Sequence, residues 1–334
     1  MENLNRQEAL VALRMYGFAT ASTDNLIELE SFSNHVWKFG DKNQSYILRQ
    51  YSKISYEKLI RQNLNLVHLI SCGIPIPNIL KNLNGTYAIH LPKWSYDLSE
   101  FIPHLKMKYP DMNISDFQIR QAAGLLAKIH NTPLEQLPFH PSDKSVEEVN
   151  TSYILQLISE FQSLLAKGTY HATSIEKTKL YNLQKLIRLT DNNRRKFLDQ
   201  GEFSLGKFSK TLSHGDFSLS NLLPEPRSKK MYIVDWENMG IRARAWELHR
   251  TLLLICGKGY CNSNFDELDF DRAVIFLDTY LKNTNLSLEE ISFLPRIAEY
   301  VSLFHWLRFT LESVSRGDNR ILEKIPEDIS RGLW

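Results

Sequence analysis

The sequence predicts an α+β fold of two lobes, a small antiparallel-sheet lobe followed by a larger, mostly helical one. Apolar and polar residues alternate before residue 92, and helix-start signatures recur after it. The chain has 334 residues, of which 43% are hydrophobic and 23% are charged. This composition excludes a disordered or fibrous protein, and the length is sufficient for two cores. We therefore expect lobes at residues 1–92 and 93–334.

The first lobe is predicted from short alternating segments separated by polar turns. Residues 40–43, Gly-Asp-Lys-Asn, join two such segments as the turn of an antiparallel pair. Ser55 can cap a helix that Gly73 ends, and the prolines after Gly73 favour an extended connection. The predicted elements are strands at 26–30, 35–39, 45–51 and 87–91, and a helix from Ser55 to about Ser71.

The second lobe is predicted to be helical because the capping-box pattern, a Ser or Thr followed three residues later by Glu or Gln, occurs four times. One interruption, between about 211 and 235, contains two short apolar segments around a Pro-rich turn and reads as a small hairpin. The four capping boxes are Ser115 with Gln118, Ser145 with Glu148, Thr173 with Glu176, and Ser287 with Glu290.

The charge balance argues against nucleic-acid or membrane partners. Lys and Arg number 40 against 38 acidic residues, so no global field would attract a polyanion. The three cysteines lack zinc-site spacing, and the amino terminus lacks the pattern of a secretory signal. The longest strongly apolar run, Leu252–Cys256, is far shorter than a membrane span. We expect a cytoplasmic protein.

The residues that indicate chemistry surround the predicted hairpin. The segment beginning His214-Gly215-Asp216 carries Asn221 five residues after Asp216, and Asp235 ends the apolar segment that follows. These three side chains supply the hard oxygen atoms that Mg²⁺ prefers, and a phosphoryl-transfer site needs such ligands together with a base. The pattern therefore predicts phosphoryl transfer.

Each of these residues has an expected role. Asp216 would accept the proton of the attacking hydroxyl, whereas Asn221 and Asp235 would hold the metal. Ser218 could contact the γ-phosphate. His214 would brace the loop without taking part in catalysis.

The same pattern resembles the aminoglycoside phosphotransferase and choline kinase superfamily, and is nearest to homoserine-kinase-like and spore-coat-associated bacterial members. The Gly-Ile-Pro-Ile-Pro connection at 73–77 and the helix at 122–130 are also similar to that family. The resemblance covers roughly residues 26–310. It implies a bilobal protein-kinase-like fold, ATP and Mg²⁺ as cofactors, and a small-molecule hydroxyl acceptor.

The resemblance also implies nucleotide contacts in the first lobe, where the family places a Lys on the third strand paired with a Glu on the next helix. The matching positions hold Arg49 and Gln62. Arg can contact phosphate through its planar fork, but Gln offers no full ion pair. Lys53 and Glu57 are the alternatives if the register differs.

Two further nucleotide contacts are expected. The turn over the phosphates, residues 31–34, lacks glycine, so Ser33 and Asn34 would have to serve there. Adenine would bind main-chain groups around His90, Leu91 and Lys93, where the two lobes are expected to meet.

The acceptor site leaves the most alternatives open. Glu247 takes the position of a family Asp, and we favour a role in bracing the catalytic loop or a helix terminus. Glu237 follows the metal-binding Asp235. Acidic and aromatic residues could line a pocket for a cationic acceptor, or could cap a helix and fill the core: Asp266, Glu267, Asp269, Asp271, Tyr300 and Trp306.

Two other functions compete with a small-molecule kinase. Arg49, Gln62 and the glycine-free turn favour a non-catalytic kinase-like protein, such as a spore-coat or scaffold component. The intact Asp216, Asn221 and Asp235 oppose that reading. Phosphorylation of a protein would require an acceptor groove that the sequence does not show.

Overall fold

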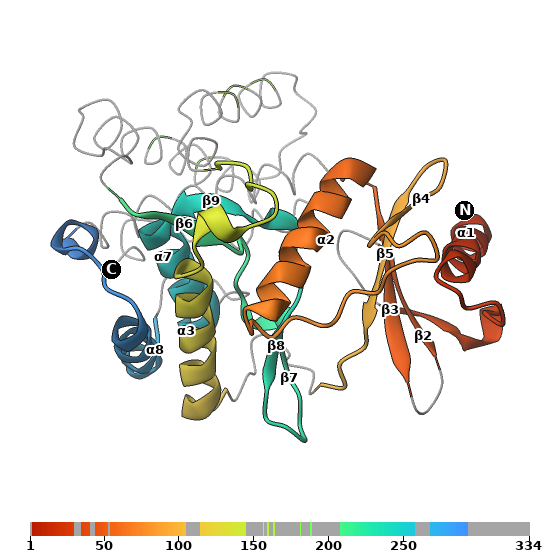
Figure 1. Ribbon diagram of the computed structural model, residues 1–334. Helices are drawn as coiled ribbons and strands as arrows, with labels where there is room; N and C mark the ends of the chain where they lie inside the picture. The colour runs from red at the N-terminus through yellow and green to blue at the C-terminus, as the bar shows by residue number, and fades with distance from the viewer. Residues whose placement is uncertain are drawn as a thin grey trace. The chain divides into compact units, whose positions relative to one another are not determined.

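The structure is a computed structural model, and Figure 1 shows its elements. Four of the predicted site and capping segments, around residues 33, 145, 173 and 266, lie outside the described residues, as do Tyr300 and Trp306. The described residues are 2–29, 35–40, 44–52, 54–104, 114–144, 208–257 and 268–292, with single residues at 156, 159, 163, 181 and 188.

The chain forms two compact units, each built from several segments. The boundary expected at residue 92 differs from this division, because the chain continues past it into a strand of the same sheet. Unit 1 contains Met1–Lys106, Pro133–Pro141 and Asn221–Asp235, and unit 2 contains Met107–Thr132, Ser142–Ser220 and Trp236–Trp334.

Unit 1 is organised around a five-stranded antiparallel sheet in the order β1-β2-β3-β5-β4. The first three strands match their predicted positions to within one residue, because their alternating patterns are clear. The strands are β1 (Leu26–Leu29), β2 (His35–Gly40), β3 (Ser45–Tyr51), β4 (Ile89–His90) and β5 (Ser95–Glu100).

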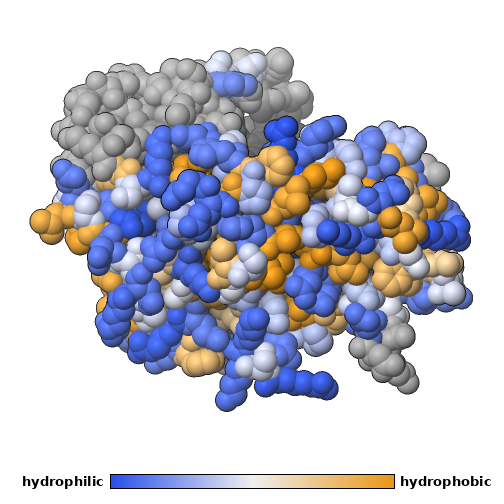
Figure 2. Space-filling view, viewed as in Figure 1, coloured by the Kyte–Doolittle hydropathy of each residue, from blue (hydrophilic) through white to orange (hydrophobic). Residues whose placement is uncertain are grey.

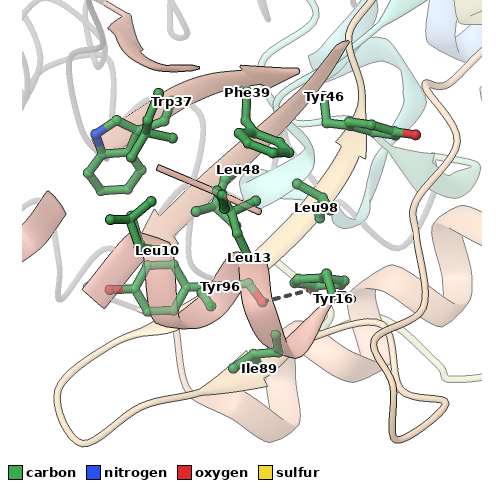
Figure 3. Packing of buried hydrophobic residues seen from close by; sticks show 14 residues of the cluster. Leu10, Leu13, Tyr16, Trp37, Phe39, Tyr46, Leu48, Ile89, Tyr96 and Leu98 are labelled. Atoms are coloured by element: carbon green, nitrogen blue, oxygen red, sulfur yellow. Dashed lines mark hydrogen bonds between the residues drawn. The ribbon is translucent and has the colours of Figure 1, made fainter. Parts of the chain in front are cut away.

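One face of this sheet packs against α1 (Glu2–Met15), which the sequence analysis did not predict. Figure 3 shows Leu13 of the helix packed among apolar side chains of the sheet, including Leu48 and Leu98. The Tyr16 hydroxyl donates to the Tyr96 carbonyl oxygen at 3.4 Å. This apolar face holds the main core of unit 1.

The opposite face of the sheet is more polar and carries α2 (Tyr56–Ser71), so the two helices lie on opposite sides of the sheet (Figure 1). The Ser55 side chain accepts from the Lys58 N–H, which confirms the predicted N-cap. The connection after α2 is tied to the later hairpin, because the Ile233 N–H donates to the Pro75 carbonyl. That hairpin consists of β7 (Leu222–Pro224) and β8 (Met231–Ile233), as predicted.

Unit 2 is largely helical in the part that the structure describes, and α3 packs against α8. The capping boxes at Ser115 and Ser287 are both present, with the Ser287 N–H donating to Glu290 at 2.8 Å. The helices are α3 (Asp116–His130), α7 (Arg244–Cys256) and α8 (Phe270–Asn283), and the strands are β6 (Lys210–Ser213) and β9 (Gly240–Ala243).

Short 3₁₀ turns connect several of these elements: η1 (Thr23–Asn25), η2 (Leu134–Gln136), η5 (Leu219–Asn221) and η6 (Trp236–Asn238).

Within the described ranges, no helix combines the length and the apolarity needed to cross a membrane. Figure 2 shows hydrophilic residues over much of the visible face, with apolar residues gathered most densely near its middle.

Candidate active site

The loop that carries Asp216 follows directly after β6 of unit 2. Gly215 adopts a φ of 82°, which only glycine reaches without strain. A side chain at this position would also meet the Asn238 carbonyl and the Arg242 guanidinium. Both features require glycine at position 215. The His-Gly-Asp sequence therefore forms a tight turn, and this turn sets the direction of the Asp216 side chain.

A buried carboxylate holds this turn in place. Glu247 of α7 is 2% exposed and accepts hydrogen bonds from the main-chain N–H groups of His214 and Gly215. Burial alone would raise its pKa, but His130, His214 and Arg242 together lower the pKa of Glu247 to about 2. The structure therefore confirms that Glu247 braces the loop that carries Asp216.

His130, at the end of α3, completes the brace. Its Nε2 lies 2.8 Å from the Glu247 carboxylate, and its Nδ1 lies 2.7 Å from the Tyr280 hydroxyl of α8. The contacts join three helices beneath the loop through side chains that are all buried. The loop is thus fixed by the core of unit 2.

His214 has the bracing position that the sequence predicted. Its Nδ1 accepts from the Asp216 N–H at 3.2 Å, and its ring centroid lies 4.5 Å from that of Trp236. The hydrogen bond links the two residues on either side of Gly215, and the contact with Trp236 holds the His214 ring. His214 is fully buried, which is consistent with a structural role.

The Asp216 side chain is about one-third exposed and pairs with Arg250 of α7 at 2.9 Å. The same guanidinium also donates to the Gly215 carbonyl. Such a two-point contact fixes both the carboxylate and the turn. Ser218 is buried, and its hydroxyl lies 2.8 Å from that of Ser220.

The two expected metal ligands belong to unit 1, where they flank the β7–β8 hairpin. The Val234 N–H donates to the Asn221 carbonyl at 3.0 Å, which keeps the two ends of the hairpin adjacent. Asp235 adopts a φ of 66°, an unusual conformation for a residue other than glycine. An amide oxygen and a carboxylate oxygen form a donor set that suits Mg²⁺. The described residues include no cluster of three or more His, Cys, Asp or Glu that could hold a metal.

Arg49, the expected phosphate contact, lies on β3 of unit 1. Burial would lower its pKa, but Tyr51, Asp97 and Asp235 oppose this effect and raise the pKa above its ordinary value. The guanidinium therefore remains charged and has two acidic neighbours.

The other expected nucleotide contacts are placed as follows. Gln62 is buried in α2, but it is the next residue, Asn63, whose amide reaches the Asp97 carboxylate, at 3.4 Å. His90 and Leu91 lie in β4 and in the turn before β5, at the edge of the sheet, because residues 89–100 form a hairpin. The chain leaves the sheet after β5, at Phe101.

Ser33, Asn34 and Lys53 lie outside the described residues. Glu57 is in the first turn of α2. Of the acidic group, Asp269 caps α8 by accepting from the Arg272 N–H and also pairs with Arg272 at 3.4 Å. Asp269 therefore fits the alternative in which an acidic residue caps a helix, and not the one in which it lines a pocket for a cationic acceptor.

The comparison with known sequences decides the family. The sequence model of the phosphotransferase enzyme family matches residues 26–273, which is well over half of the chain. The chain belongs to that family. No curated protein matches it.

Solved structures of similar fold extend over nearly the whole length of this phosphotransferase. The microcompartment-associated aminopropanol kinase gives a TM-score of 0.64 at 14% identity, covering 97% of this chain and 94% of that one. Amicoumacin kinase hAmiN, in complex with AMP-PNP and Ca²⁺, gives 0.62 at 14%, covering 98% and 93%. Spectinomycin phosphotransferase APH(9)-Ia, in complex with ADP and spectinomycin, gives 0.60 at 16%, covering 92% and 85%. At these identities the likeness shows a shared fold, which confirms the bilobal kinase-like class.

Sequence analysis of this phosphotransferase missed three residues that hold the expected site. Arg250 and His130 contact Asp216 and Glu247 from other elements, and Asp97 is the register partner of Arg49 on the neighbouring strand. Asp97 lies in a strand the sequence analysis did not predict, and Arg250 follows Glu247 by three positions, the spacing that places both on one side of a helix. That spacing is the one signal that could have identified Arg250.

Proposed function

We propose that this phosphotransferase transfers the γ-phosphoryl group of ATP to a hydroxyl group of a small metabolite. The observation that carries the proposal is the buried Glu247 carboxylate, which accepts N–H bonds from the two residues before Asp216. A fixed loop of this kind holds a carboxylate where a hydroxyl can reach it. Positioning of this sort is the main demand of phosphoryl transfer.

Asp216 acts as the base. As the acceptor oxygen forms its bond to the γ-phosphorus, the hydroxyl proton passes to the Asp216 carboxylate, and the bond to the β,γ-bridging oxygen breaks to release ADP. Arg250 keeps the carboxylate oriented through its contact with Oδ1. Ser218 is proposed to contact the γ-phosphate.

Asn221 and Asp235 are the proposed Mg²⁺ ligands. When bound, Mg²⁺ supplies charge neutralisation at the nucleotide phosphates. Arg49 adds a cation that contacts the α- and β-phosphates. Contacts of Ser33 and Asn34 with phosphate, and of His90 and Leu91 with adenine, remain predictions.

Similar structures support both the nucleotide and the acceptor class. One was solved with ADP and spectinomycin, another with AMP-PNP, and a third is an aminopropanol kinase. These acceptors differ widely, so the proposal extends only to a small metabolite that carries a hydroxyl group. Amino alcohols, homoserine, thiamine and aminoglycosides are the compounds to screen for acceptor-dependent ADP formation.

The decisive variant is Asp216→Asn. We expect kcat to fall at least about a hundredfold, the usual contribution of a general base, while the Kd for ATP measured by calorimetry stays close to that of the wild type. Asp24→Asn, which changes an exposed carboxylate of η1, is the control and should keep full activity. Retention of activity in Asp216→Asn would contradict the assigned role, and so would an equal loss of ATP binding.

A non-catalytic kinase-like protein is the second candidate, favoured by the absence of glycine from residues 31–34, where the sequence predicts a turn. A thermal-shift experiment with ATP, with and without Mg²⁺, separates the two candidates. An ATP-using enzyme shows a Tm that rises with ATP and rises further with Mg²⁺. A Tm that responds to neither addition supports the non-catalytic protein.

A further inference from the structure

The sheet of unit 1 places Arg49 directly opposite an acidic residue. Arg49 of β3 is the register partner of Asp97 on β5 and of Val36 on β2. Partners of this kind project from the same face of a sheet. This face is opposite to the one covered by α1, so Arg49 and Asp97 share the polar side of the sheet.

Asp97 is a buried carboxylate with specific donors. It is 6% exposed, and its Oδ2 accepts from the Tyr51 hydroxyl at 2.9 Å and from the Asn63 amide at 3.4 Å. A carboxylate in such surroundings is costly unless a cation balances it. Burial raises its pKa, and the charge of Arg49 is the largest opposing effect.

Tyr51 connects the two charged groups. Its hydroxyl donates to Asp97, and its side chain is also hydrogen-bonded to Arg49. Asp97 and Tyr51 therefore hold the guanidinium from the sheet, while Asn63 supports Asp97 from α2. The Asn63 amide is itself fixed by a 2.9 Å bond to the Tyr87 carbonyl.

This network differs from the arrangement that the family resemblance implies. The resemblance places an acidic partner for the phosphate-binding cation on the helix after the third strand, where this chain has Gln62. In this structure α2 contributes an amide, from Asn63, and the acidic group comes from β5. The acidic partner of Arg49 therefore lies on β5 in this chain, and not on α2.

We propose that Asp97 is the positioning residue that holds Arg49 for the nucleotide phosphates, in place of an acidic residue on α2. The inference rests on the proposed function, since it assumes that Arg49 binds phosphate. Asp97 contacts no phosphate itself, and acts by fixing the direction of the guanidinium. Tyr51 transmits this restraint.

The test compares ligands that differ in phosphate number. Calorimetry on the full chain in the presence of Mg²⁺ gives the Kd of ATP, ADP and adenosine for the wild type and for Asp97→Asn, which preserves the shape of the side chain. We expect the Kd of ATP and ADP to rise about tenfold or more, as when a partner that orients a binding group is removed. The Kd of adenosine should stay within about twofold of the wild-type value. Ser99→Ala, on the same strand and face, is the control and should leave all three values unchanged.

Two results would overturn the proposal. The first is an Asp97→Asn protein that binds ATP as tightly as the wild type. The second is an Asp97→Asn protein whose affinity for adenosine falls by the same factor as its affinity for ATP, because an equal loss indicates general damage to the fold. Should Asp97→Asn fail to fold, Tyr51→Phe is judged by the same criteria, with an expected rise of about threefold for ATP because the hydrogen bonds of the hydroxyl are removed while the Asp97 carboxylate is kept.

Arg49→Met separates this inference from the proposed function. If Arg49→Met leaves the preference for ATP over adenosine unchanged, the phosphate role of Arg49 is wrong and the inference falls with it. If Arg49→Met abolishes that preference and Asp97→Asn does not affect it, the proposed function stands and the role of Asp97 is refuted.

Discussion

Replacing Glu247 by Gln tests whether a buried carboxylate fixes the loop that carries Asp216. The two carboxylate oxygens serve three groups, the N–H of His214, the N–H of Gly215 and the His130 ring. A Gln side chain offers one acceptor oxygen and an NH₂ group that can only donate. At least one main-chain N–H is then left buried without an acceptor.

Two arguments give the same magnitude for the expected loss of folding stability. The pKa of Glu247 is lowered from 4.5 to about 2, and at 1.36 kcal/mol per pKa unit the carboxylate contributes about 3 kcal/mol to folding. Breaking a buried ion pair by removing one charge costs about 3–5 kcal/mol. We expect Glu247→Gln to lower the free energy of unfolding by about 3 kcal/mol at pH 7.

The sign of the pH dependence is fixed by the direction of the shift. Because the folded pKa lies below the unfolded value, the stabilisation is fully present above about pH 4.5 and is lost as the pH falls towards 2. The difference in unfolding free energy between wild type and Glu247→Gln should therefore be constant near neutrality and decrease in that acidic window.

Urea-induced unfolding followed by tryptophan fluorescence measures the stability, and kcat is measured well below the unfolding temperature. Glu290→Gln is the matched control, because Glu290 is equally buried and pairs with Arg244 at 2.6 Å, away from the loop that carries Asp216. Both variants should lose stability, and only Glu247→Gln should lose kcat. A Glu247→Gln protein within about 1 kcal/mol of the wild type would refute the reasoning, as would an equal loss of kcat in the control.

Two further variants probe the same loop. Gly215→Ala should lower the free energy of unfolding more than Gly85→Ala does, since both glycines have a φ near 80° but a side chain clashes with the backbone only at position 215. The excess in urea unfolding should be at least about 1 kcal/mol, and equal losses would contradict the clash. Arg250→Lys should reduce kcat about tenfold with little change in Tm, because a single ammonium cannot contact both the Gly215 carbonyl and the Asp216 carboxylate. An unchanged kcat would show that the two-point contact is not needed.

The sequence by itself determined the elements whose signals are local. Alternation located β1, β2 and β3, and Ser55, Ser115 and Ser287 marked helix starts, because caps and strand faces depend on neighbours within a few residues. Glu247 was expected to brace the loop or a helix terminus, and the structure confirmed the loop. The amino-terminal helix α1 was missed because it precedes the part of the chain in which the strand pattern begins.

The partners of the site residues were decided by tertiary structure. Asp97 meets Arg49 because β5 pairs with β3, a register that no spacing in the sequence reveals. His130 reaches Glu247 across 117 positions of the chain, through the packing of one helix against another. The residue types and their order predicted phosphoryl transfer. Which charged residues pair with one another was decided by long-range contacts, because a buried charge is stable only beside the partner that the fold brings near it.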